Sequence, residues 1–210
     1  MASPRIKFCG ITSLSDARLA VEAGAWALGT ILWPGSERHC DPAEAARIAG
    51  ELRRQAEIAG VFVNQPLDDV VRAVADMGLT HVQLHGDEGP SFCSAVAQRS
   101  GARVIKAIRV HSRADVIGAE RFHTDLHMLD GPGNGQAWDW SLASARRSRT
   151  PLLLAGGLTA ANVGEGIEAL HPWGVDVASG VESAPGVKDP ERLRDFFAAV
   201  EAASHAGAGA

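Results

Sequence analysis

The chain has 210 residues, enough for one large domain or two small ones, with a formal net charge of −5. Its Lys and Arg residues are scattered, so it lacks the basic patch that binds nucleic acid or an anionic membrane. No apolar run reaches the ~20 residues that span a bilayer, and the start, MASPRIKF, lacks the apolar core of a signal peptide. The cysteines, Cys9, Cys40 and Cys93, are too widely spaced for a disulfide framework or a CxxC metal site. We therefore expect a cytoplasmic protein with no membrane or nucleic-acid partner.

Short apolar stretches alternate along the chain with Ala-rich amphipathic stretches. The apolar stretches predict strands at 6–9, 26–32, 59–63, 81–84, 103–108, 126–130, 151–155 and 175–179. The amphipathic stretches predict helices at 13–24, 41–53, 67–78, 89–101, 112–119, 139–147, 159–170 and 188–203. The strands are continuously apolar rather than alternating, which is typical of parallel strands that are covered on both faces.

Capping residues mark several helix ends. Ser13, Asp41 and Thr159 stand where N-caps are expected, and Pro42 occupies a first helical position. Glycines stand just past the ends of three helices: Gly24, Gly78 and Gly101. These signals support the helix boundaries that the apolar pattern predicts.

Eight consecutive βα units predict an α/β protein, a (β/α)₈ (TIM) barrel that forms a single domain over residues 1–202. Residues 203–210 are small and polar, and we expect a frayed C-terminal tail. A doubly wound open sheet is the alternative. It is disfavoured because such sheets usually have about five or six strands, and no GxGxxG motif follows the first strand of this chain.

In such barrels the reactive groups lie at the carboxyl ends of the strands. In this chain these positions hold Cys9, Arg38, Gln83, His85, Asp130, Gly156, Gly157, Ser179 and Gly180. Polar residues and glycines therefore gather at one end of the barrel, which indicates a functional site there.

The last two strand ends, LAGGLT (154–159) and ASGVES (178–183), predict a phosphate site. Small residues let backbone N–H groups approach an anion closely, and a helix or helical turn follows each loop. Barrels often bind phosphate at the loops after strands 7 and 8. The alternative is that Gly156, Gly157 and Gly180 only permit tight turns.

Cys9 and Asp130 end the first and sixth strands, so they flank the mouth of a closed barrel from different sides. A thiolate can accept a proton and a carboxylic acid can donate one. An anion-binding environment is expected to lower the thiol pKa from its ordinary value near 8.5. The alternative is that Cys9 is a small buried hydrophobic residue.

The loop after the second strand carries Arg38, and Gln83 and His85 lie at the end of the fourth strand. A guanidinium suits a carboxylate through two parallel hydrogen bonds, although a lone loop arginine is more often a solvated charge. We favour a positioning or lining role for Gln83 and His85. No second ligand stands at metal-binding spacing from His85, so we expect no metal.

Seven segments, in order and with barrel spacing, resemble the phosphoribosylanthranilate isomerases of tryptophan biosynthesis. They are KFCGIT, GVFVN, VQLHGDE, VIKAI, LD with a glycine-rich loop and WDW, AGGLTAANV, and VDVASGVESAPGVKD. The resemblance implies a barrel enzyme without cofactor that isomerises N-(5′-phosphoribosyl)anthranilate by an Amadori rearrangement. It implies a small phosphorylated substrate and either a monomer or a homodimer. The loop after Asp130 departs from the family, with Asn134 and Trp138 at positions often filled by other residues.

The resemblance also assigns roles residue by residue. It implies that Cys9 is the general base, Asp130 the general acid, and Arg38 the group that holds the anthranilate carboxylate. The glycines and the serine of the last two loops would bind the phosphate. Three rivals remain: a metal-dependent epimerase, an indole-glycerol-phosphate synthase-like enzyme that uses Lys7 or Lys106, and an inactive barrel that serves as a scaffold.

Overall fold

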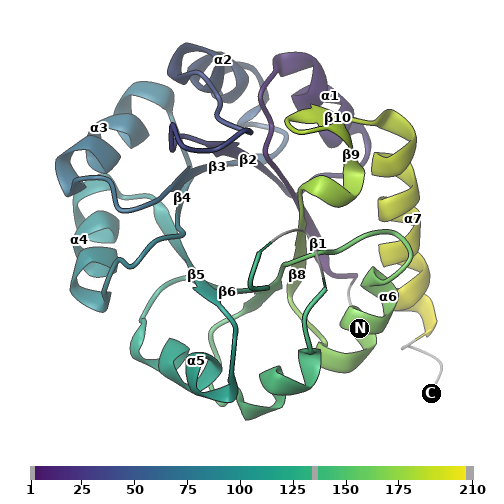
Figure 1. The fold of residues 1–210 in the computed structure, drawn as a ribbon. Coiled ribbons are helices and arrows are strands. Elements are labelled where there is room, and N and C mark those ends of the chain that lie inside the picture. Colours follow the sequence, from purple (N-terminus) through teal and green to yellow (C-terminus); the bar gives the residue numbers. More distant parts are fainter. Residues whose placement is uncertain (1–2, 134–136, 207–210) are drawn as a thin grey trace.

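The computed structural model describes residues 3–133 and 137–206 (Figure 1). Within these residues, eight parallel strands form a closed barrel in which each strand pairs with the next and β8 pairs with β1. Helices surround the barrel on its outer face (Figure 1). The (β/α)₈ barrel expected from the sequence is confirmed.

The barrel strands are β1 (Arg5–Cys9), β2 (Ala27–Ile31), β3 (Glu57–Phe62), β4 (His81–Leu84), β5 (Arg103–Arg109), β6 (Leu126–Asp130), β7 (Leu152–Leu154) and β8 (Gly174–Val177). The α-helices are α1 (Leu14–Glu22), α2 (Pro42–Leu52), α3 (Leu67–Met77), α4 (Pro90–Ser100), α5 (Arg113–Gly118), α6 (Val163–Leu170) and α7 (Pro190–Ala206). The 3₁₀ helices are η1 (Ala119–Arg121), η2 (Trp140–Ala145) and η3 (Ser179–Val181), and a hairpin joins β9 (Glu182–Ala184) to β10 (Val187–Lys188). Of the helices in the described part of the chain, none is long and apolar enough to cross a membrane.

Two of the three expected N-caps are confirmed. Ser13 Oγ accepts a hydrogen bond from the backbone N–H of Asp16 at 3.2 Å, and Asp41 Oδ1 accepts one from Ala43 at 2.8 Å. Each bond satisfies a donor that the first helical turn leaves unpaired. Pro42 begins α2 as expected.

The expected N-cap at Thr159 is wrong, because α6 begins at Val163 and Asn162 precedes it. Asn162 Oδ1 accepts a hydrogen bond from the Thr159 N–H at 2.8 Å, and its Nδ2 donates to the Gly157 carbonyl at 2.9 Å. These side-chain bonds hold the segment in a turn, and the helix therefore starts later.

The stretch 139–147 forms the six-residue 3₁₀ helix η2 rather than the expected α-helix. Asp139 Oδ1 accepts a hydrogen bond from the Ser141 N–H at 2.9 Å, which starts the helix. The segment is short and contains two serines, whose side chains compete with the helical backbone pattern.

Part of the glycine-rich loop after Asp130, including Asn134, lies outside the described residues. Trp138, on its far side, is buried, and its indole Nε1 donates a hydrogen bond to the Ala155 carbonyl at 2.9 Å. The tryptophan therefore ties the end of this loop to the end of β7.

The last helix is longer than the composition of its end predicts. α7 ends at Ala206, so residues 203–206 continue the helix, and residues 207–210 lie outside the described residues. Phe196 and Val200 of α7 are fully buried, and Phe196 packs edge-on against Phe8 of β1. Packing against the barrel therefore orders this helix.

The two ends of the barrel differ in chemistry. Trp26 and Trp173 directly precede β2 and β8, and their rings meet edge-to-face at 4.8 Å between centroids. Both pack against a buried cluster made by alternate residues of β5, β6, β7 and the residue that follows β7. Apolar side chains thus fill the amino end, where the His81 ring also packs against Trp26, and the expected site residues lie at the carboxyl end.

We predict that replacing Gly24 by Ala destabilises the fold more than replacing Gly101. Both glycines have a positive φ, +91° and +69°. The left-handed conformation costs an alanine about 1–2 kcal/mol in either case. At Gly24 the added Cβ would also lie 2.4 Å from Cε2 of Phe197, whereas at Gly101 it meets nothing within 4 Å. Overpacking of this kind costs a further ~1–3 kcal/mol.

Urea unfolding of Gly24→Ala and Gly101→Ala, each against the unchanged protein, checks this expectation. Equal losses in the free energy of unfolding would show that α7 moves away from the new methyl group without cost.

Candidate active site

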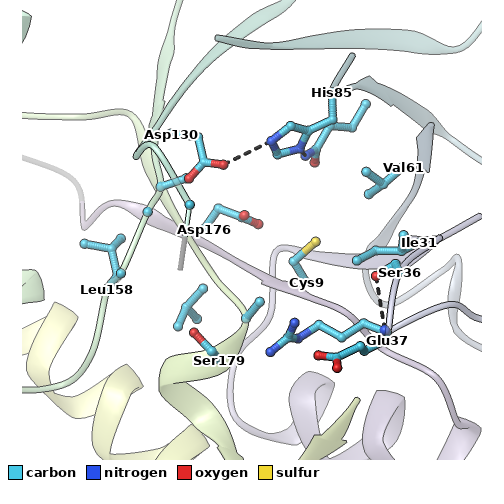
Figure 2. A pocket seen from close by; sticks show the side chains of 18 residues that line it. Cys9, Ile31, Ser36, Glu37, Val61, His85, Asp130, Leu158, Asp176 and Ser179 are labelled. Carbon is cyan, nitrogen blue, oxygen red and sulfur yellow. Dashed lines mark hydrogen bonds and ion pairs between the residues drawn. The ribbon is translucent and has the colours of Figure 1, made fainter. Parts of the chain in front are cut away.

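A cavity of about 570 Å³ opens at the carboxyl end of the barrel (Figure 2). Residues selected from the sequence line it: Cys9, Arg38, Gln83, His85, Asp130, Gly156, Gly157 and Ser179. Gly180, the remaining selected residue, lies beside the cavity in η3 rather than in its wall. Figure 2 shows Cys9 and Asp130 on opposite sides of the same space, with Ser179 at a third side. The topology therefore brings residues from both ends of the chain to one site.

Cys9 ends β1, and only 6% of its surface is exposed. Burial raises the pKa of the Cys9 thiol above its ordinary value, and the nearby Lys7 ammonium opposes that shift. This direction is opposite to the one expected from an anion-binding environment. The reason is that burial has a larger effect on the thiol than the neighbouring cations have.

Lys7 and Asp176 form a buried ion pair next to Cys9. Asp176 was not among the expected site residues, and Lys7 was expected there only for the rival synthase-like enzyme. The Lys7 ammonium is fully buried, and its Nζ donates to Asp176 Oδ1 at 2.7 Å. The two residues are register partners on β1 and β8. Burial opposes the charge on Lys7, but Asp176 outweighs it and raises the pKa of the ammonium. The available signal was a charged residue inside each of two apolar strands.

Asp130 is tied to His85 and, through it, to Gln83. His85 Nε2 lies 3.0 Å from Asp130 Oδ2 (Figure 2). Gln83 Nε2 lies 2.9 Å from His85 Nδ1. An amide nitrogen can only donate, so a neutral His85 accepts at Nδ1 and donates from Nε2 to Asp130. Gln83 and His85 thus orient the carboxyl group by way of one oxygen, Oδ2.

Arg38 reaches the cavity with one edge of its guanidinium already bound. Its Nε donates to both carboxylate oxygens of Glu182 at 3.0 and 2.9 Å, and Nη2 lies 2.8 Å from Oε2. Glu182 also accepts from Lys188 Nζ at 2.9 Å. Burial works against the charge of Glu182, but these two cations outweigh it and hold the pKa of the carboxyl below its usual value. Arg38 is therefore a fixed group and not a solvated charge.

Lys188 joins this ion-pair network to the backbone of two residues that line the cavity. Its Nζ donates to the carbonyl of Cys9 at 2.6 Å and to the carbonyl of Ala178 at 3.2 Å. The β9–β10 hairpin that carries Glu182 and Lys188 lies beside α1 in Figure 1, and the Lys188 N–H donates to Asp16 Oδ2 of that helix. Both residues stand in a motif, ESAPGVKD (182–189), that the sequence analysis matched only as part of a family pattern.

The glycines of the last two loops permit close approach of the backbone. A Cβ at Gly156 would lie 2.3 Å from the backbone nitrogen of Gly131, and Gly156 has a φ of +89°. A Cβ at Gly180 would lie 2.0 Å from the carbonyl oxygen of Leu158. Only glycine fits at these two positions. The tight-turn explanation therefore accounts for both glycines, and the lining of the cavity by Gly156, Gly157 and Ser179 leaves the phosphate role as a prediction.

Comparison with known proteins decides the family. Residues 6–199 match the family model described as N-(5′-phosphoribosyl)anthranilate (PRA) isomerase. The chain belongs to the phosphoribosylanthranilate isomerase family. It is 43% identical over 199 residues to N-(5′-phosphoribosyl)anthranilate isomerase from Geobacter metallireducens, covering 92% of this chain and 96% of that relative.

Solved structures of phosphoribosylanthranilate isomerases share the fold. The Thermus thermophilus enzyme superposes with a TM-score of 0.87 at 39% identity, covering 94% of this chain and 98% of the other. A complex of such an isomerase with reduced 1-(o-carboxyphenylamino)-1-deoxyribulose 5-phosphate superposes with a TM-score of 0.84 at 36% identity, covering 95% and 99%. The Thermotoga maritima enzyme, also similar, is dimeric.

We predict that Glu182→Gln destabilises this isomerase by about 3 kcal/mol at neutral pH, because it leaves two cations without their shared carboxylate. The pKa of Glu182 is lowered in the folded protein, so its contribution is present above the unfolded-state value and is lost as the pH falls through the folded-state value. The gap in unfolding free energy between the unchanged protein and Glu182→Gln should therefore shrink under acidic conditions.

Urea unfolding at pH 7 and pH 4 measures that gap. Glu37→Gln is the matched control, since Glu37 is an exposed carboxylate beside Arg38 without a hydrogen bond to it in the described contacts. An equal loss in both variants, or a gap that does not depend on pH, would contradict the prediction.

Proposed function

We propose that this cavity converts N-(5′-phosphoribosyl)anthranilate into 1-(2-carboxyphenylamino)-1-deoxyribulose 5-phosphate, with Asp130 as general acid and Cys9 as general base. The observation that supports this most directly is that both side chains line the same cavity, Asp130 from β6 and Cys9 from β1 (Figure 2). A small sugar between them meets a proton donor on one side and an acceptor on the other.

The rearrangement takes two enzyme-assisted proton transfers, followed by a tautomerisation. Asp130 donates a proton to the furanose ring oxygen, the bond from that oxygen to C1′ breaks, and the nitrogen lone pair forms the C=N bond of a Schiff base. The Cys9 thiolate then removes the C2′ proton, and the electron pair moves to give an enolamine that tautomerises to the ketone. Each positioned proton transfer commonly contributes about 10²–10⁴ in rate. The isomerisation has no net oxidation or reduction, so we propose no cofactor.

The rest of the cavity holds the substrate at both ends. The backbone of the loops that contain Gly156, Gly157, Ser179 and Gly180 would bind the phosphate. The free edge of the Arg38 guanidinium would bind the anthranilate carboxylate, while Glu182 fixes the opposite edge. Anchoring both ends places C2′ between acid and base, which supplies orientation as well as proton transfer.

The rival chemistries find weaker support in the site. Lys106, one of the two candidate lysines for a synthase, donates to Glu88 at 2.9 Å and to the Gly86 carbonyl at 2.7 Å, away from the cavity lining. Lys7 is bound to Asp176. Within residues 3–133 and 137–206, no group of three or more His, Cys, Asp and Glu side chains stands close enough to hold a metal ion.

Cys9→Ala should lower kcat/KM by about 10²–10⁴, because the C2′ proton then has no positioned acceptor. The assay follows the fluorescence of chemically generated phosphoribosylanthranilate. Cys93→Ala, which removes another buried thiol outside the cavity lining, is the control and should keep nearly full activity. Near-normal turnover by a folded Cys9→Ala protein would reject the base assignment.

Asp130→Asn should reduce turnover by a similar factor, since an amide cannot donate an acidic proton to the ring oxygen. The same fluorescence assay, run across neutral pH, gives kcat and KM separately. Asp87→Asn removes another carboxylate of the carboxyl rim that does not line the cavity, and it should change both constants little. A folded Asp130→Asn protein with the full rate at every pH would remove Asp130 as the acid.

A further inference from the structure

The Cys9 thiol and the Lys7 ammonium converge on one point above β2. A Cβ built on Gly29 would lie 2.8 Å from Cys9 Sγ and 2.9 Å from Lys7 Nζ. Gly29 is the register partner of Cys9, while Lys7 pairs with Ala27. The glycine therefore leaves the space in which sulfur and ammonium approach one another inside the barrel.

Lys7 is held at that point by Asp176. The ammonium is fully buried and has three N–H donors, one of which goes to Asp176 Oδ1 at 2.7 Å. The ion pair with Asp176 uses one of these N–H groups, so the Lys7 ammonium can still donate hydrogen bonds to a second anion. The Cys9 sulfur is beside it, so a thiolate there gains a charge-assisted contact that a thiol lacks.

The other charged groups around Cys9 are already engaged with one another. Lys188 from β10 and Arg38 from the loop after β2 both bind the Glu182 carboxylate. Lys188 also donates to the Cys9 carbonyl and thus holds the backbone. Lys7 is the cation whose ammonium nitrogen lies next to the Cys9 sulfur, above Gly29.

We propose that Lys7 is a positioning residue that stabilises the thiolate of Cys9, and that Asp176 limits this effect by competing for the same ammonium. The inference rests on the proposed function and adds how the general base is formed. Lys7 remains protonated throughout and transfers no proton; it acts by its charge. Asp176 holds Lys7 in place, but its own negative charge disfavours a second anion at the sulfur.

The two charged residues should therefore move the thiol in opposite directions. Removing the cation in Lys7→Met should raise the pH at which Cys9 ionises. Removing the carboxylate in Asp176→Asn frees the ammonium for sulfur and should lower that pH. A shift of one unit changes the thiolate fraction at neutral pH by about tenfold. A residue that only supported the fold would not produce opposite shifts.

The test is the rate of Cys9 alkylation by iodoacetamide in the unliganded enzyme from pH 6 to 10, followed by mass spectrometry of the Cys9 peptide. Lys7→Met should react at least about tenfold more slowly than the unchanged protein at pH 7, and Asp176→Asn faster. Cys40 and Cys93, measured in the same digests, report any general loosening of the fold. Shifts in the same direction in both variants, or no shift in Lys7→Met, would overturn the inference.

Gly29→Ala gives a second test that keeps both charges. It tests the same inference if Lys7→Met does not fold. Its methyl group would force sulfur and ammonium apart, so the ionisation of Cys9 should move to higher pH. An unchanged alkylation profile in folded Gly29→Ala would also overturn the inference. Failure of the proposed function looks different: Cys9→Ala would keep its turnover, whatever the alkylation profiles show.

Discussion

The pairing of β1 with β8 closes the sheet, and this closure brings residues from both ends of the chain to one cavity. Arg5 to Phe8 pair with Gly174 to Val177 in parallel register. Across this seam, Lys7 contacts Asp176, and Lys188 reaches the carbonyl of Cys9. Cys9, the proposed base, and the expected phosphate loops are therefore neighbours only in a barrel that has closed.

Buried charges are concentrated at this end of the barrel. The ion pairs Lys7–Asp176, Lys106–Glu88 and Lys188–Glu182 are all largely hidden from solvent. Such pairs seldom add net stability compared with apolar residues of similar size, because each ion loses its hydration. Their value in this barrel lies in position. Lys106 and Lys188 each bind a backbone carbonyl at the rim, and the Lys7–Asp176 pair lies beside Cys9.

The sequence predicted the parts of the site that are marked by local pattern. The placement of Cys9 and Asp130 at the cavity was predictable because each ends an apolar strand at the rim that carries the chemistry in such barrels. The eight strands followed from apolar runs of the right length. Thr159 was wrongly expected to be an N-cap. Asn162 lies only three residues later and is also a favoured capping residue, so the sequence pattern does not distinguish the two positions.

The remaining features of the site depend on contacts between distant residues. Lys7 and Asp176 are 169 positions apart, and Arg38 and Glu182 are 144 apart, so neither pairing is visible in a window of sequence. The shift in the Cys9 pKa depends on burial, which a residue's type and neighbours do not determine. The burial of the Cys9 sulfur depends on the closed barrel. The direction of its pKa shift therefore emerged only from the structure.

The hydroxyl of Ser3 bonds to Glu201 and Ser204 of α7, so the described chain starts and finishes at one place (Figure 1). A short linker between these ends, with new termini opened in a loop elsewhere, would turn the most remote strand pair into consecutive elements. Such a circularly permuted chain would form the β1–β8 seam by local closure, at a smaller entropic cost. The order in which the strands assemble can thus change without changing the arrangement of side chains around the cavity.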